Sequence, residues 1–221
     1  QLQTEASSLQ TQLSTYGKLQ SGMATLRDAA SALTRATTWG ATTGVSSDAT
    51  AVAVSTNTTT LPGSYAIEVH QLAAPQSNAS GVYASADSLV GEGTLRIELG
   101  TWGAGQTSFT PQAGATAVEI SFGPPAESLA QLRDKINASN AGVVASVLTD
   151  ASGARLVLRS ASTGAENGFR IGVTDNDGNN ADGIGLSALA FDPSAGILTM
   201  AQALSAANAS ASLNGLPITS A

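Results

Sequence analysis

The N-terminal part of the chain alternates apolar and polar positions with the period of an α-helix. Apolar side chains recur at steps of three, four and seven residues, which places them on one stripe of a helix. Gly17 and Gly22 each cost about 1 kcal/mol relative to alanine inside a helix, so this helix needs a packing partner. We expect Trp39-Gly40 and the following Thr/Gly cluster to end it. The stripe consists of Leu2, Leu9, Leu13, Tyr16, Leu19, Met23, Leu26, Ala30 and Leu33.

The stripe has two interpretations, because an amphipathic helix covers either its own domain or something else. No second helix of similar length follows in the sequence, which disfavours packing on its own core. We therefore expect the stripe to meet another subunit or chain segments outside this sequence, as in a coiled coil. The residues that we expect to make this contact are Leu9, Leu13, Tyr16, Met23 and Leu26.

From about residue 45 the period changes to two, which is typical of strands with one buried face. In the clearest case, Leu95, Ile97 and Leu99 alternate with the charged Arg96 and Glu98. The expected strands in this part are 50–55, 64–72, 94–100 and 117–122, and Gly123-Pro124-Pro125 is expected to stop the last of them.

The second half of the chain adds one short helix to the strands. The helix is expected over 127–137, where Leu129, Leu132 and Ile136 share a face. The other expected elements are a hairpin of strands 143–149 and 154–160, a strand at 169–173, a loop at 175–185, and two half-strands around an Asn-Gly turn within 211–218. One short helix among antiparallel strands indicates an α+β fold, here preceded by the long amphipathic helix.

Composition and charge exclude several classes of function. The 221 residues carry a net charge of -7, which argues against nucleic acid as a partner, since such binding needs a basic patch. With no cysteine and one histidine, disulfides, thiol nucleophiles and sites with two imidazoles are excluded. No apolar run approaches the 18 or more residues of a membrane span, so we expect no membrane insertion. The chain begins at Gln1 without a signal-peptide pattern, and we expect it to be part of a longer protein.

Three candidate sites for chemistry have simpler explanations. His70 lies on the expected outer face of a strand, and no Gly-x-Ser-x-Gly motif accompanies it. Residues 175–179 resemble the start of a calcium loop, but Asn180 and Leu186 stand where such a loop needs glycine and glutamate. Glu68 and Glu98 have no aromatic platforms around them that would suggest a glycosidase. We expect no enzyme activity, no metal and no cofactor.

Three stretches of the sequence together match the motifs of one protein family. Residues 64–76 are similar to the family segment YxIxVxQLAxxQ. Residues 128–137 with 140–147 are similar to SLxxLRDxINxxNAGVxASV, and residues 155–167 to YRLxLTSxxTGxxN, with Arg155 in place of the usual aromatic residue. The closing LNGLPI segment and the opening helix also resemble this family, which is that of the flagellar filament cap proteins, also called hook-associated protein 2. The resemblance runs from about residue 9 to the end.

The resemblance implies a structural protein that is exported by the flagellar secretion system and caps the distal end of the filament. Leg helices reach down to the filament, a β-rich head forms a plate, and the cap helps incoming flagellin to fold and insert. The chain would then hold a leg helix at 1–43, part of a first head domain at 44–100 and a second head domain at 101–221. The implied partners are copies of itself in a ring, flagellin and the hook–filament junction proteins, with an export chaperone and host mucin as further candidates.

Two other functions stay open at this stage. An adhesin at the flagellar tip would bind mucin or glycans through loops 101–116 and 175–185, and Trp102 is the aromatic residue there that would favour sugar binding. A hook-junction or flagellin-like subunit would share the helical leg, but it gives no reason for the LRDKIN and NAGVVASV stretch.

Overall fold

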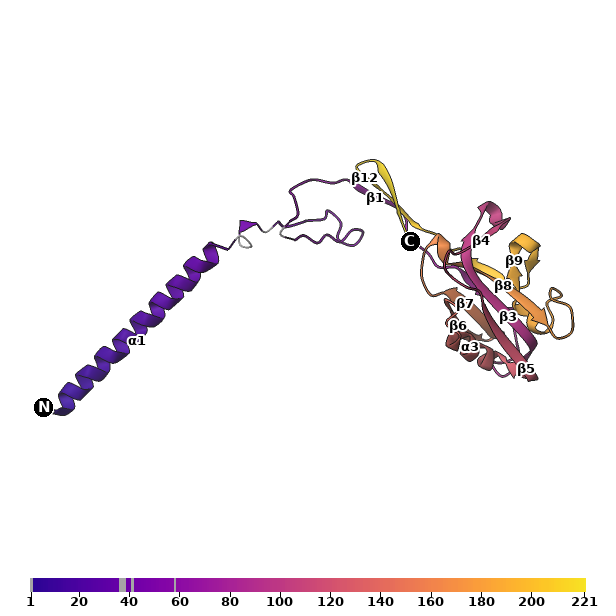
Figure 1. The fold of residues 1–221 in the computed structure, drawn as a ribbon, viewed down its shortest axis with the longest axis horizontal. Helices are drawn as coiled ribbons and strands as arrows, with labels where there is room; N and C mark the ends of the chain where they lie inside the picture. The colour runs from indigo at the N-terminus through magenta and orange to yellow at the C-terminus, as the bar shows by residue number, and fades with distance from the viewer. Residues whose placement is uncertain (1, 36–38, 41, 58) are drawn as a thin grey trace. The chain divides into compact units, whose positions relative to one another are not determined.

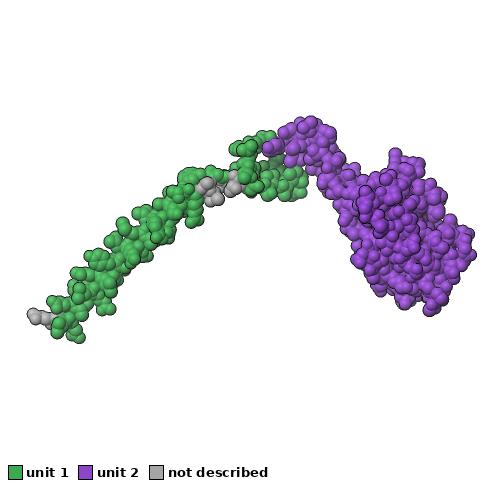
Figure 2. All heavy atoms as spheres, in the orientation of Figure 1, with its two compact units in different colours: residues 1–64 green, residues 65–221 purple. Residues whose placement is uncertain are grey.

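The chain forms two compact units, residues 1–64 and residues 65–221 (Figure 2). The computed structural model describes residues 2–35, 39–40, 42–57 and 59–221. The division between Ser64 and Tyr65 differs from the boundaries expected at 43/44 and 100/101. Strand β3, Leu89–Trp102, runs through position 100 and pairs with strands from later in the chain, so residues on both sides of that position share one sheet.

The long N-terminal helix is confirmed as α1, Leu2–Leu33 (Figure 1). It ends earlier than Trp39-Gly40, although residues 36–38 and 41 lie outside the described residues. The hydroxyl of Thr34 donates to the carbonyl of Ser31 at 2.9 Å, which gives the last turn a local alternative to helix continuation.

The strand expected at 50–55 is wrong, because no described residue of this stretch belongs to a strand. The Asp48 carboxylate accepts hydrogen bonds from the backbone and hydroxyl of Thr50, at 2.9 and 2.5 Å, and its carbonyl accepts from Val52. Asp48 therefore folds the start of this stretch into a turn, as aspartate often does, and residues 52–55 that follow have no regular structure. The Ala/Val alternation that predicted a strand has no partner strand among the described residues of this unit.

Unit 2, residues 65–221, contains three antiparallel sheets, which confirms the α+β class. The six-stranded sheet has β4 (Phe109–Pro111) and β5 (Val118–Ser128) paired with β3, followed by β8 (Gly168–Asp175), β9 (Phe191–Asp192) and β10 (Ile197–Leu198). The four-stranded sheet has the order β11 (Ala201–Leu204), β2 (Ser77–Ala79), β7 (Gly153–Ser160) and β6 (Val143–Asp150). The three-stranded sheet has the order β1 (Ile67–Gln71), β12 (Ala209–Leu213) and β13 (Leu216–Ser220).

The core lies between the two larger sheets and α3, Leu129–Ala138. Alternate residues of each strand point into it, as the period of two predicts. Its fully buried side chains include Leu95, Ile97, Leu132, Ile136, Leu156, Leu158, Phe169 and Ile171. Helix α3 begins with a capping box in which Ser128 and Gln131 bond to each other's backbone. Short 3-10 segments at 104–106, 165–167, 185–189 and 193–195 complete the unit.

Strand β5 corrects the expectation that Gly123-Pro124-Pro125 would stop the strand at residue 122. The pairing with β3 resumes after a bulge, since Phe122 pairs with Gly93 and Glu127 pairs with Gly91. Residues 123–126 therefore fall in the irregular part of the ladder, where proline is tolerated because its missing N–H is not needed.

The two expected hairpins are confirmed. Strands β6 and β7 pair from Val143↔Ser160 to Asp150↔Gly153. Strands β12 and β13 meet at Asn214-Gly215, where both residues have positive φ, 51° and 80°, as Asn-Gly hairpin turns require.

Candidate assembly surfaces

The apolar stripe of α1 is exposed along its whole length, since no described residue of the helix is buried. The five expected contact residues Leu9, Leu13, Tyr16, Met23 and Leu26 each expose between 65% and 73% of their surface. Leaving a large apolar side chain in water forgoes about 1.5–3 kcal/mol of burial per residue. The stripe is therefore not covered by the described residues, and its contact with another subunit or helix stays a prediction.

The stripe follows a repeat of seven rather than the turn of a straight helix. Leu9, Tyr16 and Met23 are seven residues apart, and Leu19 and Leu26 lie three residues after two of them. A strict repeat of seven drifts around a straight helix, so continuous contact along it requires a left-handed supercoil with another helix. The stripe is thus suited to a coiled-coil partner rather than to a flat sheet.

The interior of α1 gives the helix little stability of its own. Three threonine hydroxyls donate back to carbonyls four residues earlier, Thr11 to Ser7, Thr15 to Thr11 and Thr25 to Ser21. Such back-bonding slightly weakens a helix, and the two internal glycines add to the effect. A helix of this kind obtains its stability from packing against a partner.

The three-stranded sheet presents a second open apolar surface. All residues of β1 and β13 are exposed, and all residues of β12 are half-buried. Cross-strand pairing places apolar residues of the three strands on one face of the sheet. Polar residues such as Glu68 and Ser212 lie on the opposite face. The rows of this apolar face are Ile67, Leu213 and Leu216, then Val69, Ala211 and Ile218.

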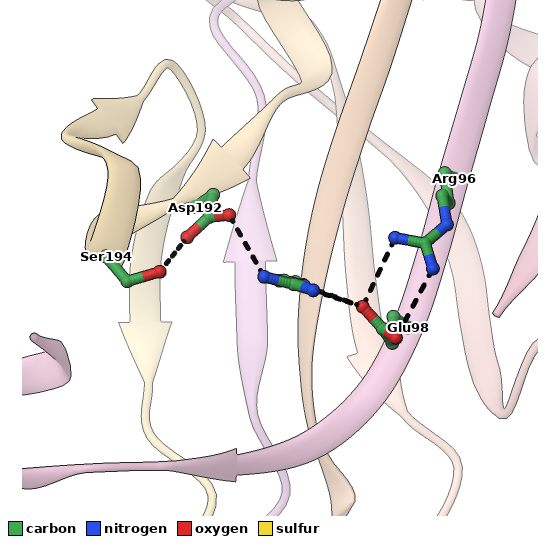
Figure 3. Close-up of polar contacts among 5 residues, drawn as sticks. Arg96, Glu98, Asp192 and Ser194 are labelled. Atoms are coloured by element: carbon green, nitrogen blue, oxygen red, sulfur yellow. Dashed lines mark hydrogen bonds and ion pairs between the residues drawn. The ribbon is translucent and has the colours of Figure 1, made fainter. Parts of the chain in front are cut away.

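The outer face of the six-stranded sheet is occupied by ion pairs. Arg170 on β8 binds Glu98 on β3 at 2.6 Å and Asp192 on β9 at 3.5 Å, and Arg96 binds Glu98 at 3.3 Å (Figure 3). Ser194 donates to Asp192 at 2.5 Å. The sequence predicted that Arg96 and Glu98 point outward, but not that Arg170 and Asp192 join them, because their pairing depends on the strand order.

Trp102 does not serve as an exposed platform for sugars. Its indole N–H donates to the side-chain oxygen of Gln76 at 2.9 Å. The centre of its ring lies 4.6 Å from the ring centre of Phe109 and 5.9 Å from that of Phe191. Gln76 is fully buried and also bonds to the backbone of Phe169. The aromatic residue that would favour glycan binding thus belongs to the packing of unit 2.

The residues considered for chemistry do not converge. His70 lies 3.9 Å from Glu68 on the exposed β1, whereas Glu98 belongs to the ion pairs of the six-stranded sheet. In the 175–185 loop, Asp177 accepts from the backbone of Asn179, and Asp182 accepts from Ile184 and Ser187. Among the described residues, no group of three or more His, Asp or Glu side chains could hold a metal ion. The acidic residues of the loop hold turns together.

In the part of the chain that the structure describes, no helix combines the length and apolarity needed to span a bilayer.

Comparison with known proteins links these surfaces to one family. Residues 1–76 match the family model for the N-terminus of flagellar hook-associated protein 2, and residues 113–162 match the flagellin hook IN motif. The B-type flagellar hook-associated protein 2 of Pseudomonas aeruginosa is 33% identical over 196 residues, which is 87% of this chain and 38% of that protein. The flagellar hook-associated protein 2 of Escherichia coli K12 is 30% identical over 98% of this chain and 43% of its own length. The chain thus spans well under half of these relatives.

Solved structures give the same relationship at the level of the fold. The D1-D2-D3 domains of the flagellar cap protein FliD from Escherichia coli superpose with a TM-score of 0.66 at 26% identity, covering 94% of this chain and 54% of that one. FliD (HAP2) from Pseudomonas aeruginosa gives a TM-score of 0.54 at 31% identity, covering 73% of this chain and 67% of that one.

Proposed function

Because this chain belongs to the flagellar hook-associated protein 2 family, whose members are structural cap proteins and not enzymes, we propose that it is part of a cap at the distal end of a flagellar filament. In this proposal the protein acts outside the cell after export by the flagellar secretion system. Copies of the protein form an oligomeric plate, which shelters the growing end so that flagellin folds before it joins the filament. Flagellin and the hook–filament junction proteins are its other proposed partners.

The observation that carries this proposal is the exposed stripe of α1 with its repeat of seven. A coiled-coil stripe with no partner among the described residues suits a leg that packs against helices from the rest of the protein, from other copies or from the filament. Leu9, Leu13, Tyr16, Met23 and Leu26 are the proposed contact residues. Their function is to hold the leg in place, and the mechanism is geometric rather than chemical.

The proposal is tested in the full-length protein by changing Leu13→Asp and Met23→Asp together. A carboxylate at a buried position of a helix contact is strongly unfavourable, so we expect capping to fail and unpolymerised flagellin to accumulate in the medium. The measurement compares secreted flagellin with filament length.

The matched control places the same charges on the opposite side of the helix, as Ser14→Asp with Ser21→Asp. We expect filaments of normal length from this control, because both serines face away from the stripe. Normal filaments from the Leu13/Met23 variant as well would refute the role of the stripe.

A further inference from the structure

The net charge of the chain is confined to one of its two units. Residues 65–221 contain thirteen Asp and Glu residues but six Lys and Arg residues, whereas residues 1–64 contain three of each. The whole net charge of -7 therefore belongs to unit 2. Any basic surface on this unit stands out from an acidic background and attracts acidic partners.

One such basic surface lies on the outward side of the β6–β7 hairpin. Arg155, Val157 and Arg159 alternate along β7 with core residues and so point away from the core. Across the ladder, Val144 pairs with Arg159 and Leu148 pairs with Arg155. We call these five residues, Val144, Leu148, Arg155, Val157 and Arg159, the β6–β7 face.

The β6–β7 face combines exposed apolar side chains with two arginines that make no direct ion pair among the described residues. Val144 and Leu148 expose 52% and 56% of their surface. Among the described residues, neither Arg155 nor Arg159 has a carboxylate within 4.0 Å, whereas the other four cations of unit 2 each form an ion pair, namely Arg96, Arg133, Lys135 and Arg170. Arg155 also interacts electrostatically with Asp150 at the end of β6, beyond the distance of an ion pair. Two guanidinium groups without a direct ion pair, beside an apolar strip, suit a partner that is both acidic and apolar.

The same unit carries a surface with the complementary properties in the loop after β8. Residues 176–184 are all exposed and contain Asp177 and Asp182. Ile184, at the end of this stretch, exposes 67% of its surface. Figure 1 draws β6 and β7 on one side of unit 2 and the loop that follows β8 on the other, so the two surfaces of one molecule face different neighbours.

We propose that the β6–β7 face binds the 176–184 loop of a second copy of this chain. Arg155 and Arg159 would pair with the loop carboxylates, and Ile184 would pack on Val144, Leu148 and Val157. Because the two surfaces differ, the contact is heterologous, and repeated contacts close into a ring when the rotation between neighbours permits. This inference rests on the proposed function, in which copies of the protein form a plate, and it names the surfaces that join them.

The test is a charge exchange in the full-length protein, followed by sedimentation or light scattering to measure self-association. The double change Arg155→Glu with Arg159→Glu should weaken association about tenfold or more, since like charges then face each other. The double change Asp177→Arg with Asn179→Arg should do the same while keeping Asp182, which holds the loop through Ser187. Combining all four changes should recover most of the lost association, because the charges are again complementary.

Arg133→Glu is the control for the Arg155/Arg159 variant. It also turns an arginine of unit 2 into a glutamate, but on α3 and away from the β6–β7 face. Its association should stay at the wild-type value. Circular dichroism of each variant establishes that unit 2 is folded. The inference is overturned if the Arg155/Arg159 variant associates like the wild type, or if the combined variant is as weak as the single-surface variants. Failure of the wild-type full-length protein to associate overturns the oligomeric plate itself, which is a distinguishable result.

Discussion

At the residue scale, Glu98 holds the outer face of the six-stranded sheet together. Only 13% of its side chain is exposed, and it accepts from both Arg170 and Arg96, so its charge joins β3 to β8. Arg170 also lies over the ring of Phe109, with its guanidinium carbon 4.9 Å from the ring centre. Removing the Glu98 carboxylate would leave the half-buried guanidinium of Arg170 without its main partner. This lowers the stability of the fold more than the loss of an exposed ion pair does.

We expect Glu98→Gln to lower the free energy of unfolding of this chain by about 1–2 kcal/mol, because an amide oxygen replaces a charged acceptor. Urea denaturation followed by circular dichroism measures the change. Glu68→Gln is the control, since the Glu68 side chain is 76% exposed and should change stability by less than about 0.5 kcal/mol. Equal effects from the two substitutions would show that the ion pairs on the sheet contribute little.

At the element scale, the three sheets differ in how much they bury. Strands β3, β7 and β8 each place several fully buried side chains in the core. Strands β1, β12 and β13 bury none of theirs, so their hydrogen bonds have solvent close by. Local opening is easiest where few apolar contacts are lost.

Amide hydrogen exchange of this chain should therefore separate the sheets. We expect β1, β12 and β13 to exchange faster than β3, β7 and β8, because opening the three-stranded sheet leaves the core intact. Mass spectrometry of peptic peptides measures the rates. Peptides from β6 provide the control, since β6 belongs to a hairpin like β12 and β13 but packs on the core. Equal protection in all sheets would contradict this view.

The sequence predicted the elements whose information is local. The β6–β7 hairpin, α3 and the Asn214-Gly215 turn each depend on residues within a short stretch, and all three are confirmed. The strand at 50–55 is wrong because alternation alone does not supply a partner strand, and Asp48 offers the backbone a turn instead. The outer ion pairs depend on β8 and β9 lying beside β3, which no local pattern encodes.

Of the two candidate contact surfaces, one could be predicted from local sequence and the other could not. The stripe of α1 could be read from spacing, because every member lies on one helix and the missing partner leaves all of them exposed. The β6–β7 face required the structure, since the strand register decides that Val144 lies opposite Arg159. Arg155 was visible in the sequence as a departure from the family pattern, but not as part of a basic surface.

At the scale of the whole molecule, the two units differ in their dependence on outside partners. Unit 2 has its own core, whereas unit 1 contains an exposed helix and a stretch from 42 to 64 in which no described residue belongs to a strand. The described residues of this stretch make few backbone–backbone hydrogen bonds, and most of their hydrogen bonds involve side chains of nearby residues. Exposed segments without regular structure are the usual sites of proteolytic cleavage.

Limited proteolysis of this chain should leave a resistant product that begins near Tyr65 and contains the core of unit 2. A broad-specificity protease and mass spectrometry of the products provide the measurement. Full-length protein under identical conditions is the control, and there we expect α1 to be protected because its stripe is covered. If α1 survives in the shorter chain as well as unit 2 does, the helix does not need a partner.

The segregation of charge has a consequence for how a cap of this kind responds to its surroundings. Unit 1 has equal numbers of positive and negative residues, and the contacts proposed for its stripe are apolar, so added salt would not weaken them. The contact proposed for unit 2 is partly electrostatic, and the range of its charge interactions shortens to about 8 Å at physiological ionic strength. The affinity of the leg for the filament and the affinity of neighbouring heads for one another would then depend differently on salt. Going from brackish to fresh water would change the affinity between heads and leave the binding to the filament unaltered.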